Sequence, residues 1–381
     1  MSENIVILGG GVGGVVAATE LRKHLGRKHR IILVDKDGQH LYAPSLLWVL
    51  NGSREPHALT KDLACLERKG IEVVKEEVLS VDLDSKQVRT GTQTIQYDWL
   101  VVSLGSDLDF EAIPGLRGAG ETFYNLEGVV ALRDRLRTFR GCSVAVVIAS
   151  LPFKCPAAPY EAAFIMEAHL RSRGVEARVD IYTPEKLPMK VAGPDIGKSL
   201  VGMLESRDIG FHPEHNIAEV DQDDGNLRFQ NDDSARADLL AYVPVHRAPT
   251  VVSEAGLTDG QGWISVDPQT LGTAHENVYA IGDVACVRLS SGMNLPMAGV
   301  FAHGEAKVVA RNIVAQTKGD IGHVDYKGHG SCWIETGDGR AAFGKGDFYG
   351  VPMPSVKLYK SSRYRHWSKV LFEKYWMWRW F

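Results

Sequence analysis

The chain has no long hydrophobic run and no visible leader sequence. Nothing in its 381 residues approaches the roughly 18 consecutive apolar residues of a membrane-spanning helix. The first residues, Met-Ser-Glu-Asn, lead directly into an apolar segment at residues 5–8, with no signal peptide before it. We therefore expect a protein of the cytoplasm whose chain does not cross a membrane.

Cysteine is scarce as well, and neither sign of charge dominates. Five cysteines are too few for a disulfide scaffold, so a working disulfide in a cytoplasmic protein would be catalytic rather than structural. The net charge of −4 provides no global attraction to nucleic acid. We predict neither a nucleic-acid partner nor a metal site.

Apolar strand candidates alternate with helical candidates through most of the chain, which predicts an α/β fold built from parallel units. The strand candidates are residues 5–8, 31–34, 100–103, 144–149, 179–182, 239–243 and 278–281, and the helical candidates are residues 12–25, 129–139, 159–173 and 298–316. Residues 72–98 are rich in charged and β-branched side chains, which predicts a small additional sheet.

A glycine motif between the first strand and the first helix predicts a dinucleotide site. Gly9, Gly11 and Gly14 fit the pattern G-x-G-x-x-G, in which glycines permit a tight turn and the helix N-terminus faces a pyrophosphate. Asp35 ends the second strand, about 20 residues further on, where an acid can bind a ribose hydroxyl. The alternative is a glycine-rich turn without a ligand.

A second segment selects FAD as the dinucleotide. Residues 273–283, which end in Gly282-Asp283, resemble the second FAD motif of flavoproteins with two dinucleotide domains. That resemblance implies that Asp283 binds the ribitol and that the helix starting near Ala298 points its N-terminus at the flavin. Further residues assigned to the FAD site are Lys36, Pro44, Ser103 and Gly105.

The second glycine motif that NADH-dependent flavoproteins carry is missing. Residues 150–156 read Ser-Leu-Pro-Phe-Lys-Cys-Pro, without a glycine that would let a pyrophosphate approach, and with two prolines that stiffen the turn. The strand at residues 179–182 also ends without the acid that a NAD ribose would bind. NADH is therefore a poor candidate for the electron donor.

Cys155 occupies the place of the missing motif, just ahead of a predicted helix. The helix N-terminus and the neighbouring Lys154 would both favour the thiolate, although a lone cysteine is more often a buried structural residue. The segment Phe-Lys-Cys-Pro-Ala-Ala-Pro-Tyr-Glu, residues 153–161, closely resembles the first redox-cysteine segment of sulfide:quinone oxidoreductases. It is also similar to that of the flavin subunit of flavocytochrome c sulfide dehydrogenase.

This resemblance implies a second redox cysteine near the C-terminus, which matches Cys332 in Gly-Ser-Cys-Trp. Sulfide would then attack a Cys155–Cys332 disulfide, and Cys332 would pass electrons to FAD. Glu161 and Lys154 are candidates for the proton and charge partners, unless they simply belong to a solvated helix start. Many sulfide:quinone oxidoreductases have a third essential cysteine, and residues 114–125 contain none, which leaves the sulfur product open.

The last 25 residues, from Lys357 to Phe381, are basic and aromatic. Trp367, Val370, Leu371, Tyr375 and Trp378 recur at helical spacing, flanked by Arg363, Lys369, Lys374 and Arg379, which predicts a helix on an anionic membrane surface. The alternative is a tail packed on its own domain or on a second copy of the chain.

A membrane surface suits a quinone acceptor, and the resemblance implies a peripheral enzyme on the cytoplasmic side of the membrane. It places the quinone near residues 296–303 and 343–349, with Phe301, Phe343 and Phe348 as lining residues. Met297 departs from the lysine that family members commonly have after the matching proline.

Together these features predict two Rossmann-like dinucleotide-binding domains and a C-terminal region with an amphipathic tail. We assign residues 1–110 and 245–320 to the FAD domain, residues 111–244 to the domain of Cys155, and residues 321–381 to the C-terminal region. Three alternative functions stay open: a sulfide dehydrogenase that reduces a cytochrome, a type II NADH:quinone oxidoreductase, and a non-catalytic flavin-binding protein of the membrane surface. The oligomeric state also stays open, including a homo-oligomer.

Overall fold

The strand β1 (Asn4–Leu8) lies in the middle of a five-stranded parallel sheet. The structure, a computed structural model, describes residues 2–320 and 322–381. The order of strands is β21 (Val278–Ala280), β9 (Trp99–Val102), β1, β2 (Arg30–Val34) and β5 (Glu72–Val74). The sheet therefore joins the first hundred residues to a strand near residue 280.

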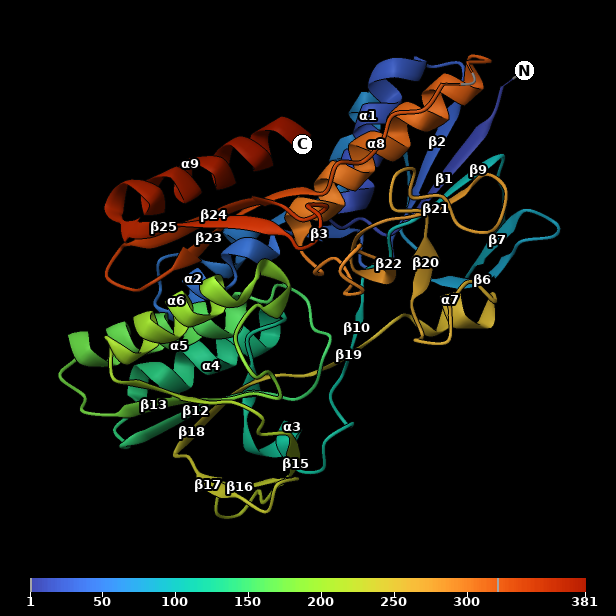
Figure 1. Ribbon diagram of the computed structural model, residues 1–381. Coiled ribbons are helices and arrows are strands. Elements are labelled where there is room, and N and C mark those ends of the chain that lie inside the picture. The colour runs from blue at the N-terminus through green and yellow to red at the C-terminus, as the bar shows by residue number, and fades with distance from the viewer. Residues whose placement is uncertain (1, 321) are drawn as a thin grey trace.

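Helices α1 (Val12–Leu25) and α8 (Gly299–Thr317) lie side by side on this sheet (Figure 1). Ile5, Ile7 and Ile31 pack with them in one core, while Val6, Leu8 and Ile32 pack on the opposite face. Both faces of the sheet are covered, which explains why its strands read as continuous apolar runs rather than alternating ones.

A second five-stranded parallel sheet lies in the other lobe of Figure 1, with helices α4, α5 and α6. Its strand order is β11 (Glu121–Thr122), β18 (Leu239–Val243), β12 (Ser143–Ile148), β13 (Arg178–Tyr182) and β14 (Ile209–His212). The helices are α4 (Leu126–Thr138), α5 (Ala158–Ser172) and α6 (Pro194–Glu205). The antiparallel pair β10 (Asp107–Asp109) and β19 (Val245–Arg247) connects the two lobes.

The C-terminal residues form an antiparallel sheet and a helix. The strands β23 (His329–Glu335), β24 (Ala341–Asp347) and β25 (Ser355–Ser362) pair in sequence order. Helix α9 (Arg363–Trp380) lies over them (Figure 1). Ser362 caps this helix by accepting a hydrogen bond from the Arg365 N–H, as N-cap serines commonly do.

The remaining α-helices and strands are short. They are β3 (Gln39–Leu41), α2 (Leu47–Leu50), β4 (Thr60–Asp62), β6 (Val78–Asp82), β7 (Gln87–Thr90), β8 (Thr94–Gln96), α3 (Leu116–Ala119), β15 (Ile217–Val220), β16 (Asn226–Phe229), β17 (Ser234–Arg236), α7 (Thr250–Glu254), β20 (Ile264–Val266) and β22 (Ala285–Val287).

The predicted strands and helices are confirmed to within a few residues at each end. The segment at residues 72–98 is confirmed only in part as a separate sheet. Strands β6, β7 and β8 do form one, but β5 joins the large parallel sheet instead. Within the described part of the chain, no helix is both long enough and apolar enough to cross a membrane.

Candidate active site

The glycine turn after β1 has the shape that a dinucleotide pyrophosphate requires. Gly9 has φ +98°, and a Cβ atom on Gly14 would lie 1.9 Å from the carbonyl oxygen of Gly9. The corresponding Cβ on Gly11 would meet no atom within 4 Å, so that side of the turn is open. Backbone can therefore approach a ligand at Gly11, directly before the N-terminus of α1.

Asp35 holds this turn in place. Its carboxylate accepts hydrogen bonds from the backbone N–H groups of Gly10, Asp37 and Gly38 at 2.7, 3.0 and 2.9 Å. Lys36 follows it and is exposed, and Pro44 is exposed in a 3-10 turn (Ala43–Ser45). The sequence predicted a ribose contact for Asp35, and the structure adds this backbone role.

Gly282 and Asp283 stand at the end of β21, close to the start of α8. Gly282 has φ +73°, and its N–H donates a 2.7 Å hydrogen bond to the buried carboxylate of Glu305. Burial raises the pKa of Asp283, and the charge of Lys154 opposes that shift. Burial also raises the pKa of Glu305 to about 8.

Three further residues assigned to the cofactor site are Ser103, Gly105 and Ala298, of which Ser103 borders the glycine turn after β1. Ser103 is buried at the end of β9, where a Cβ atom on Gly13 would lie 2.6 Å from its hydroxyl oxygen. Gly105 follows with φ +70°. Ala298 is the N-cap of α8 and provides no side-chain hydrogen bond, so the first N–H groups of that helix are available to a ligand.

Cys155 lies at the point where the two lobes meet. Its N–H donates a 2.7 Å hydrogen bond to the carbonyl of Met297, and its own carbonyl accepts one from the N–H of Ala158, the first residue of α5. Its φ is +53°, a left-handed conformation that costs free energy in a residue other than glycine. Cys155 was predicted just ahead of a helix, and this is confirmed.

Cys332 lies in β23, where it pairs with Gly344. Its thiol donates to the carbonyl of Trp333 at 3.2 Å. Cys155 and Cys332 are both free thiols and both partly buried. Their disulfide therefore stays a prediction.

Cys332 affects the pKa of Cys155, and Lys369 affects the pKa of both thiols. Burial raises the pKa of Cys332 to about 12, with a further rise from Glu161 and an opposing effect of Lys369. Burial also raises the pKa of Cys155 well above its usual value, with Cys332 and Glu161 adding to the rise and Lys369 opposing it. The prediction that Cys155 favours its thiolate is wrong for the reduced pair, because desolvation outweighs the charge effects.

Lys369 is a cation near the thiols that the sequence did not assign to them. Lys369 lies on α9 and is buried, and its Nζ donates to Glu161 Oε1 at 3.0 Å. Burial lowers the pKa of Lys154, against the opposing charge of Asp283. Lys369 lowers the pKa of Cys155, and the charge of Cys155 also raises the pKa of Lys154, so Lys154 stays a predicted charge partner.

Glu161 is not part of a solvated helix start, because it is only 4% exposed. Its Oε1 also accepts a 2.8 Å hydrogen bond from the backbone N–H of Glu335. Glu335 in turn accepts from His366 Nδ1, with 2.9 Å between Oε2 and Nδ1. The sequence reading missed Glu335 and His366 and placed Lys369 beside the membrane face.

A spacing signal for the burial of Lys369 was present in the tail. Lys369, Val370, Glu373, Trp376, Met377 and Trp380 recur three or four residues apart and form the buried face of α9. Val370 was assigned to the exposed stripe, and this is wrong because it is 8% exposed. Trp367, Leu371, Tyr375 and Trp378 are exposed as expected.

The three aromatic residues assigned to the quinone are only partly brought together. Phe301 and Phe348 meet edge to face, with ring centroids 4.9 Å apart. Phe343 instead contacts Trp333 and Tyr359, with centroids 5.1 and 6.2 Å away. In β23, Trp333 neighbours Cys332 and therefore points to the opposite face of the sheet.

The other three cysteines lie apart from this pair. Cys65 lies in a 3-10 helix (Leu63–Lys69), Cys142 directly precedes β12, and Cys286 is buried in β22. Cys142 donates through its backbone N–H to Asp238 at 2.8 Å.

Known proteins resemble this chain over nearly its whole length. The mitochondrial sulfide:quinone oxidoreductase of Mus musculus is 25% identical over 373 residues, which cover 94% of this chain and 81% of that protein. The sulfide-quinone reductase of Aquifex aeolicus (strain VF5) is 24% identical over 396 residues, which cover 100% of this chain and 91% of that protein.

A solved structure and a family model extend the comparison. The X-ray structure of the sulfide:quinone oxidoreductase from Aquifex aeolicus has the same fold, with a TM-score of 0.89 and 23% identity over 100% of this chain and 91% of that one. The model of the pyridine nucleotide-disulphide oxidoreductase family matches residues 3–306, the part that contains both parallel sheets and Cys155. The chain therefore belongs to the pyridine nucleotide-disulphide oxidoreductase family.

Proposed function

We infer that this protein is an FAD-dependent sulfide:quinone oxidoreductase. The observation that carries this inference is the pair of partly buried thiols, Cys155 and Cys332, beside a dinucleotide site. Relatives that cover nearly the whole chain bear the same function in their names. The absence of a glycine motif after β12 supports sulfide rather than NADH as the donor.

The cofactor FAD suits the site. The open turn at Gly11 and the uncapped N-terminus of α8 provide two positions where backbone N–H groups can face a bound ligand. The residues that would hold it are Gly9, Gly11, Gly14, Asp35, Lys36, Pro44, Ser103, Gly105, Gly282, Asp283 and Ala298. When bound, FAD supplies a centre that accepts an electron pair from the thiols and releases it to a quinone.

The sulfur chemistry belongs to the two cysteines. Hydrosulfide attacks a Cys155–Cys332 disulfide: the bond between the cysteine sulfurs breaks, a new sulfur–sulfur bond forms, and a persulfide and a thiolate result. Cys332 is the thiolate on the cofactor side. Lys369 stabilises this negative charge, because its own positive charge opposes the rise in pKa that burial causes in both thiols.

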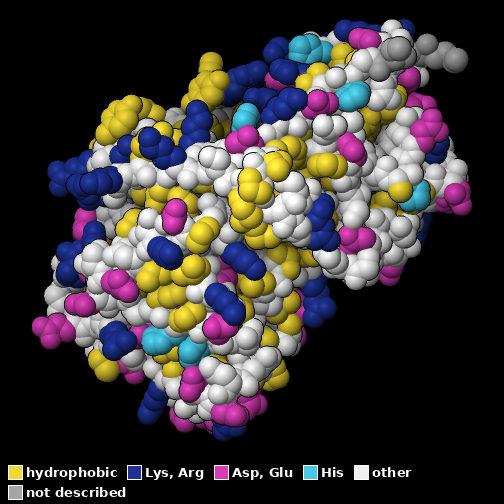
Figure 2. All heavy atoms as spheres, in the orientation of Figure 1, with side chains coloured by type: hydrophobic (Ala, Val, Ile, Leu, Met, Phe, Trp, Pro, Cys, Tyr) yellow, Lys and Arg dark blue, Asp and Glu magenta, His cyan; other side chains and the backbone are white. Residues whose placement is uncertain are grey.

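Helix α9 attaches the enzyme to the membrane that contains its acceptor. Trp367, Leu371, Tyr375 and Trp378 are 62%, 66%, 54% and 76% exposed. Figure 2 shows hydrophobic side chains projecting over α9, with Lys and Arg beside them. Such a surface favours the headgroup region of an anionic bilayer, and we place the enzyme on its cytoplasmic side.

The quinone lies on the other side of the cofactor from the thiols. Phe301 and Phe348 line this site, and their contact supports the assignment. Phe343 is the weaker candidate, because it packs with Trp333, whose ring contacts Phe372 of α9. The division into an FAD domain (residues 1–110 and 245–320), a cysteine domain (residues 111–244) and a C-terminal region (residues 321–381) follows the same proposal.

An anaerobic titration of the holoenzyme tests this function. Sulfide should bleach the flavin absorbance, NADH should not, and a short-chain quinone should restore the colour. Bleaching by NADH with no response to sulfide would support a type II NADH:quinone oxidoreductase instead. A flavin that responds to neither donor would support a non-catalytic flavoprotein, and reoxidation by a cytochrome but not by a quinone would support a sulfide dehydrogenase.

A further inference from the structure

His40 is a buried histidine beside the glycine turn, outside the set of residues assigned to the FAD site. It lies in β3 and is 0% exposed. Its Nδ1 lies 2.9 Å from the carbonyl oxygen of Gly10. Because a carbonyl oxygen can only accept, Nδ1 carries the ring hydrogen and donates this hydrogen bond. Burial lowers the pKa of His40 to about 4, so the ring is neutral when it makes the bond.

His40 and Asp35 together hold both polar groups of Gly10. The Gly10 N–H donates to Asp35 at 2.7 Å, and the Gly10 carbonyl accepts from His40. Asp35 directly follows β2 and His40 lies in β3, so two separate segments restrain one backbone residue. The orientation of the Gly10 peptide groups therefore depends on these two side chains as well as on the turn itself.

The bond to His40 also sets the direction of the next N–H group. The Gly10 carbonyl shares a planar trans peptide unit with the Gly11 N–H, and the two groups point in opposite directions. Within the described residues, the Gly11 N–H has no protein acceptor, and a Cβ atom on Gly11 would meet nothing within 4 Å. This N–H is thus available to a phosphate oxygen directly ahead of α1.

Helix α9 keeps the ring of His40 in place. His40 stacks on Trp376, with ring centroids 4.9 Å apart and 23° between the ring planes, and Phe381 lies 5.3 Å away. Trp376 is only 3% exposed. The histidine ring therefore cannot turn away from the Gly10 carbonyl without displacing aromatic side chains of the tail.

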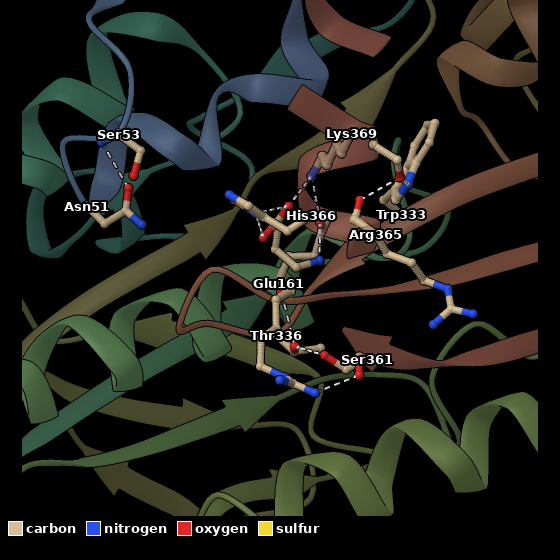
Figure 3. A network of polar contacts seen from close by, with 12 residues as sticks. Asn51, Ser53, Glu161, Trp333, Thr336, Ser361, Arg365, His366 and Lys369 are labelled. Atoms are coloured by element: carbon tan, nitrogen blue, oxygen red, sulfur yellow. Dashed lines mark hydrogen bonds and ion pairs between the residues drawn. The ribbon is translucent and has the colours of Figure 1, made fainter. Parts of the chain in front are cut away.

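The buried face of α9 is itself held by polar contacts. Glu373 accepts from Ser45 at 2.6 Å and from Arg54 at 2.9 Å. Figure 3 shows Lys369 pointing from α9 toward Glu161, to which it donates at 3.0 Å. These bonds fix the position of the helix, and with it the tryptophan that packs on the histidine.

We propose that His40 is a positioning residue for FAD and that Trp376 keeps it in this role. His40 holds the peptide between Gly10 and Gly11 in the orientation that a pyrophosphate requires, before FAD binds. A turn that is already ordered loses less entropy on binding. The affinity for FAD therefore depends on the His40 hydrogen bond and, through it, on helix α9. This inference rests on the proposed function, which places FAD at this turn.

The test compares substitutions that differ in this hydrogen bond. His40→Asn can keep it, because the amide nitrogen takes the place of Nδ1, whereas His40→Leu has nearly the same shape as asparagine and cannot. His40→Phe is a second variant without the bond, and it keeps a ring against Trp376. The matched control is His29→Leu, a buried histidine at the opposite end of β2.

Full-length holoenzyme is diluted in steps, and the fluorescence of released FAD gives the dissociation constant. The melting temperature of each variant separates a loss of stability from a loss of cofactor affinity. His40→Leu and His40→Phe should raise the dissociation constant by about tenfold, the scale set by one lost hydrogen bond. His40→Asn and His29→Leu should stay near the wild-type value. Trp376→Leu should weaken FAD binding, and Trp376→Phe, which retains a ring against His40, should not.

Wild-type affinity in folded His40→Leu or His40→Phe would overturn the proposal. An equal loss of FAD in His40→Asn or His29→Leu would also overturn it, because the loss would then follow packing rather than the hydrogen bond. Wild-type affinity in folded Trp376→Leu would overturn the role of α9. These three results leave the proposed function standing, whereas a wild type that binds no FAD would overturn both.

Discussion

The backbone N–H of Cys155 donates a 2.7 Å hydrogen bond to the carbonyl oxygen of Met297. Met297 directly precedes Ala298, the N-cap of α8. A NADH-dependent relative would bind a second nucleotide in this loop. Here the loop is hydrogen-bonded to the start of α8, which lies beside the first nucleotide site. This bond, together with a φ of +53°, holds Cys155 against the cofactor site.

Alanine substitutions in the glycine turn should separate folding from cofactor binding. Gly11→Ala should fold but lose most of its FAD, because its Cβ atom meets open space in the protein and would meet the pyrophosphate in the holoenzyme. Gly14→Ala should fail to fold normally, since its Cβ atom would lie 1.9 Å from the Gly9 carbonyl oxygen. The measurements are the ratio of FAD to protein and the melting temperature.

Gly202→Ala is the matched control, because its Cβ atom in α6 would also meet nothing within 4 Å. It should retain FAD and should gain slightly in stability from the better helix propensity. Full FAD content in Gly11→Ala would contradict the placement of the pyrophosphate.

Stability should fall as the pH rises toward 8, partly because of Glu305. Burial raises the pKa of this carboxyl to about 8, so the folded protein retains a proton that the unfolded chain releases near its ordinary pKa. The free energy of unfolding then decreases by up to about 1.4 kcal/mol per pH unit between these two pKa values. Glu305→Gln should remove this contribution, because glutamine resembles the protonated acid and can still accept from the Gly282 N–H.

Denaturant unfolding of both proteins at several values between pH 5 and pH 8 measures the difference. The stability of the wild type relative to Glu305→Gln should fall across this interval. A constant difference would mean that Glu305 does not titrate there.

The rate at which reduced Cys332 is alkylated should keep rising with pH and should reach no plateau in the accessible pH range. Because burial raises its pKa to about 12, the thiolate fraction should increase about tenfold per pH unit from pH 7 to pH 10. The measurement is the rate of iodoacetamide labelling, assigned to Cys332 by peptide mass spectrometry, with Cys332→Ser to identify the background. A plateau below pH 9 would show that the thiol is far less desolvated than the structure indicates.

Loss of the exposed aromatics of α9 should release the enzyme from membranes. Trp367→Ser combined with Trp378→Ser removes two of its most exposed hydrophobic side chains. Each buries enough apolar surface in a bilayer to change the affinity by roughly tenfold or more. Co-sedimentation with vesicles that contain anionic lipid measures the change. High salt should also weaken the binding of the wild type to these vesicles.

The control for this experiment is Leu79→Ser, a comparable change at an exposed residue of β6. It should bind vesicles like the wild type. Unchanged binding of the double tryptophan variant would leave α9 as a helix that only packs on its own sheet.

Much of the fold could be predicted because its strands are buried on both faces. Such strands appear in the sequence as uninterrupted apolar runs, and β1, β2 and β18 were recognised in this way. Segment ends and the small sheet at residues 72–98 were less certain, because short edge strands such as β5 pair according to tertiary context rather than local pattern.

The thiol pair was recognised by resemblance and Glu161 was named beside it, whereas the partners of Glu161, Lys369 and Glu335, were not recognised. Lys369 is separated from Glu161 by 208 residues, and no local pattern indicates a contact over that distance. Its basic character suggested a membrane face, but its spacing with Glu373 and Trp376 belongs to the buried side of α9. Likewise, desolvation reversed the pKa expected for Cys155, and burial on that scale depends on segments brought together only by folding.

The most direct test of the account is rapid anaerobic mixing of sulfide with Cys155→Ser and Cys332→Ser, each loaded with FAD, beside a Cys142→Ser control. Cys142 is exposed and lies ahead of β12, away from the pair. The account predicts that sulfide bleaches the flavin in the wild type and in Cys142→Ser, and that bleaching is lost in both other variants. Bleaching at the wild-type rate in either Cys155→Ser or Cys332→Ser would contradict it.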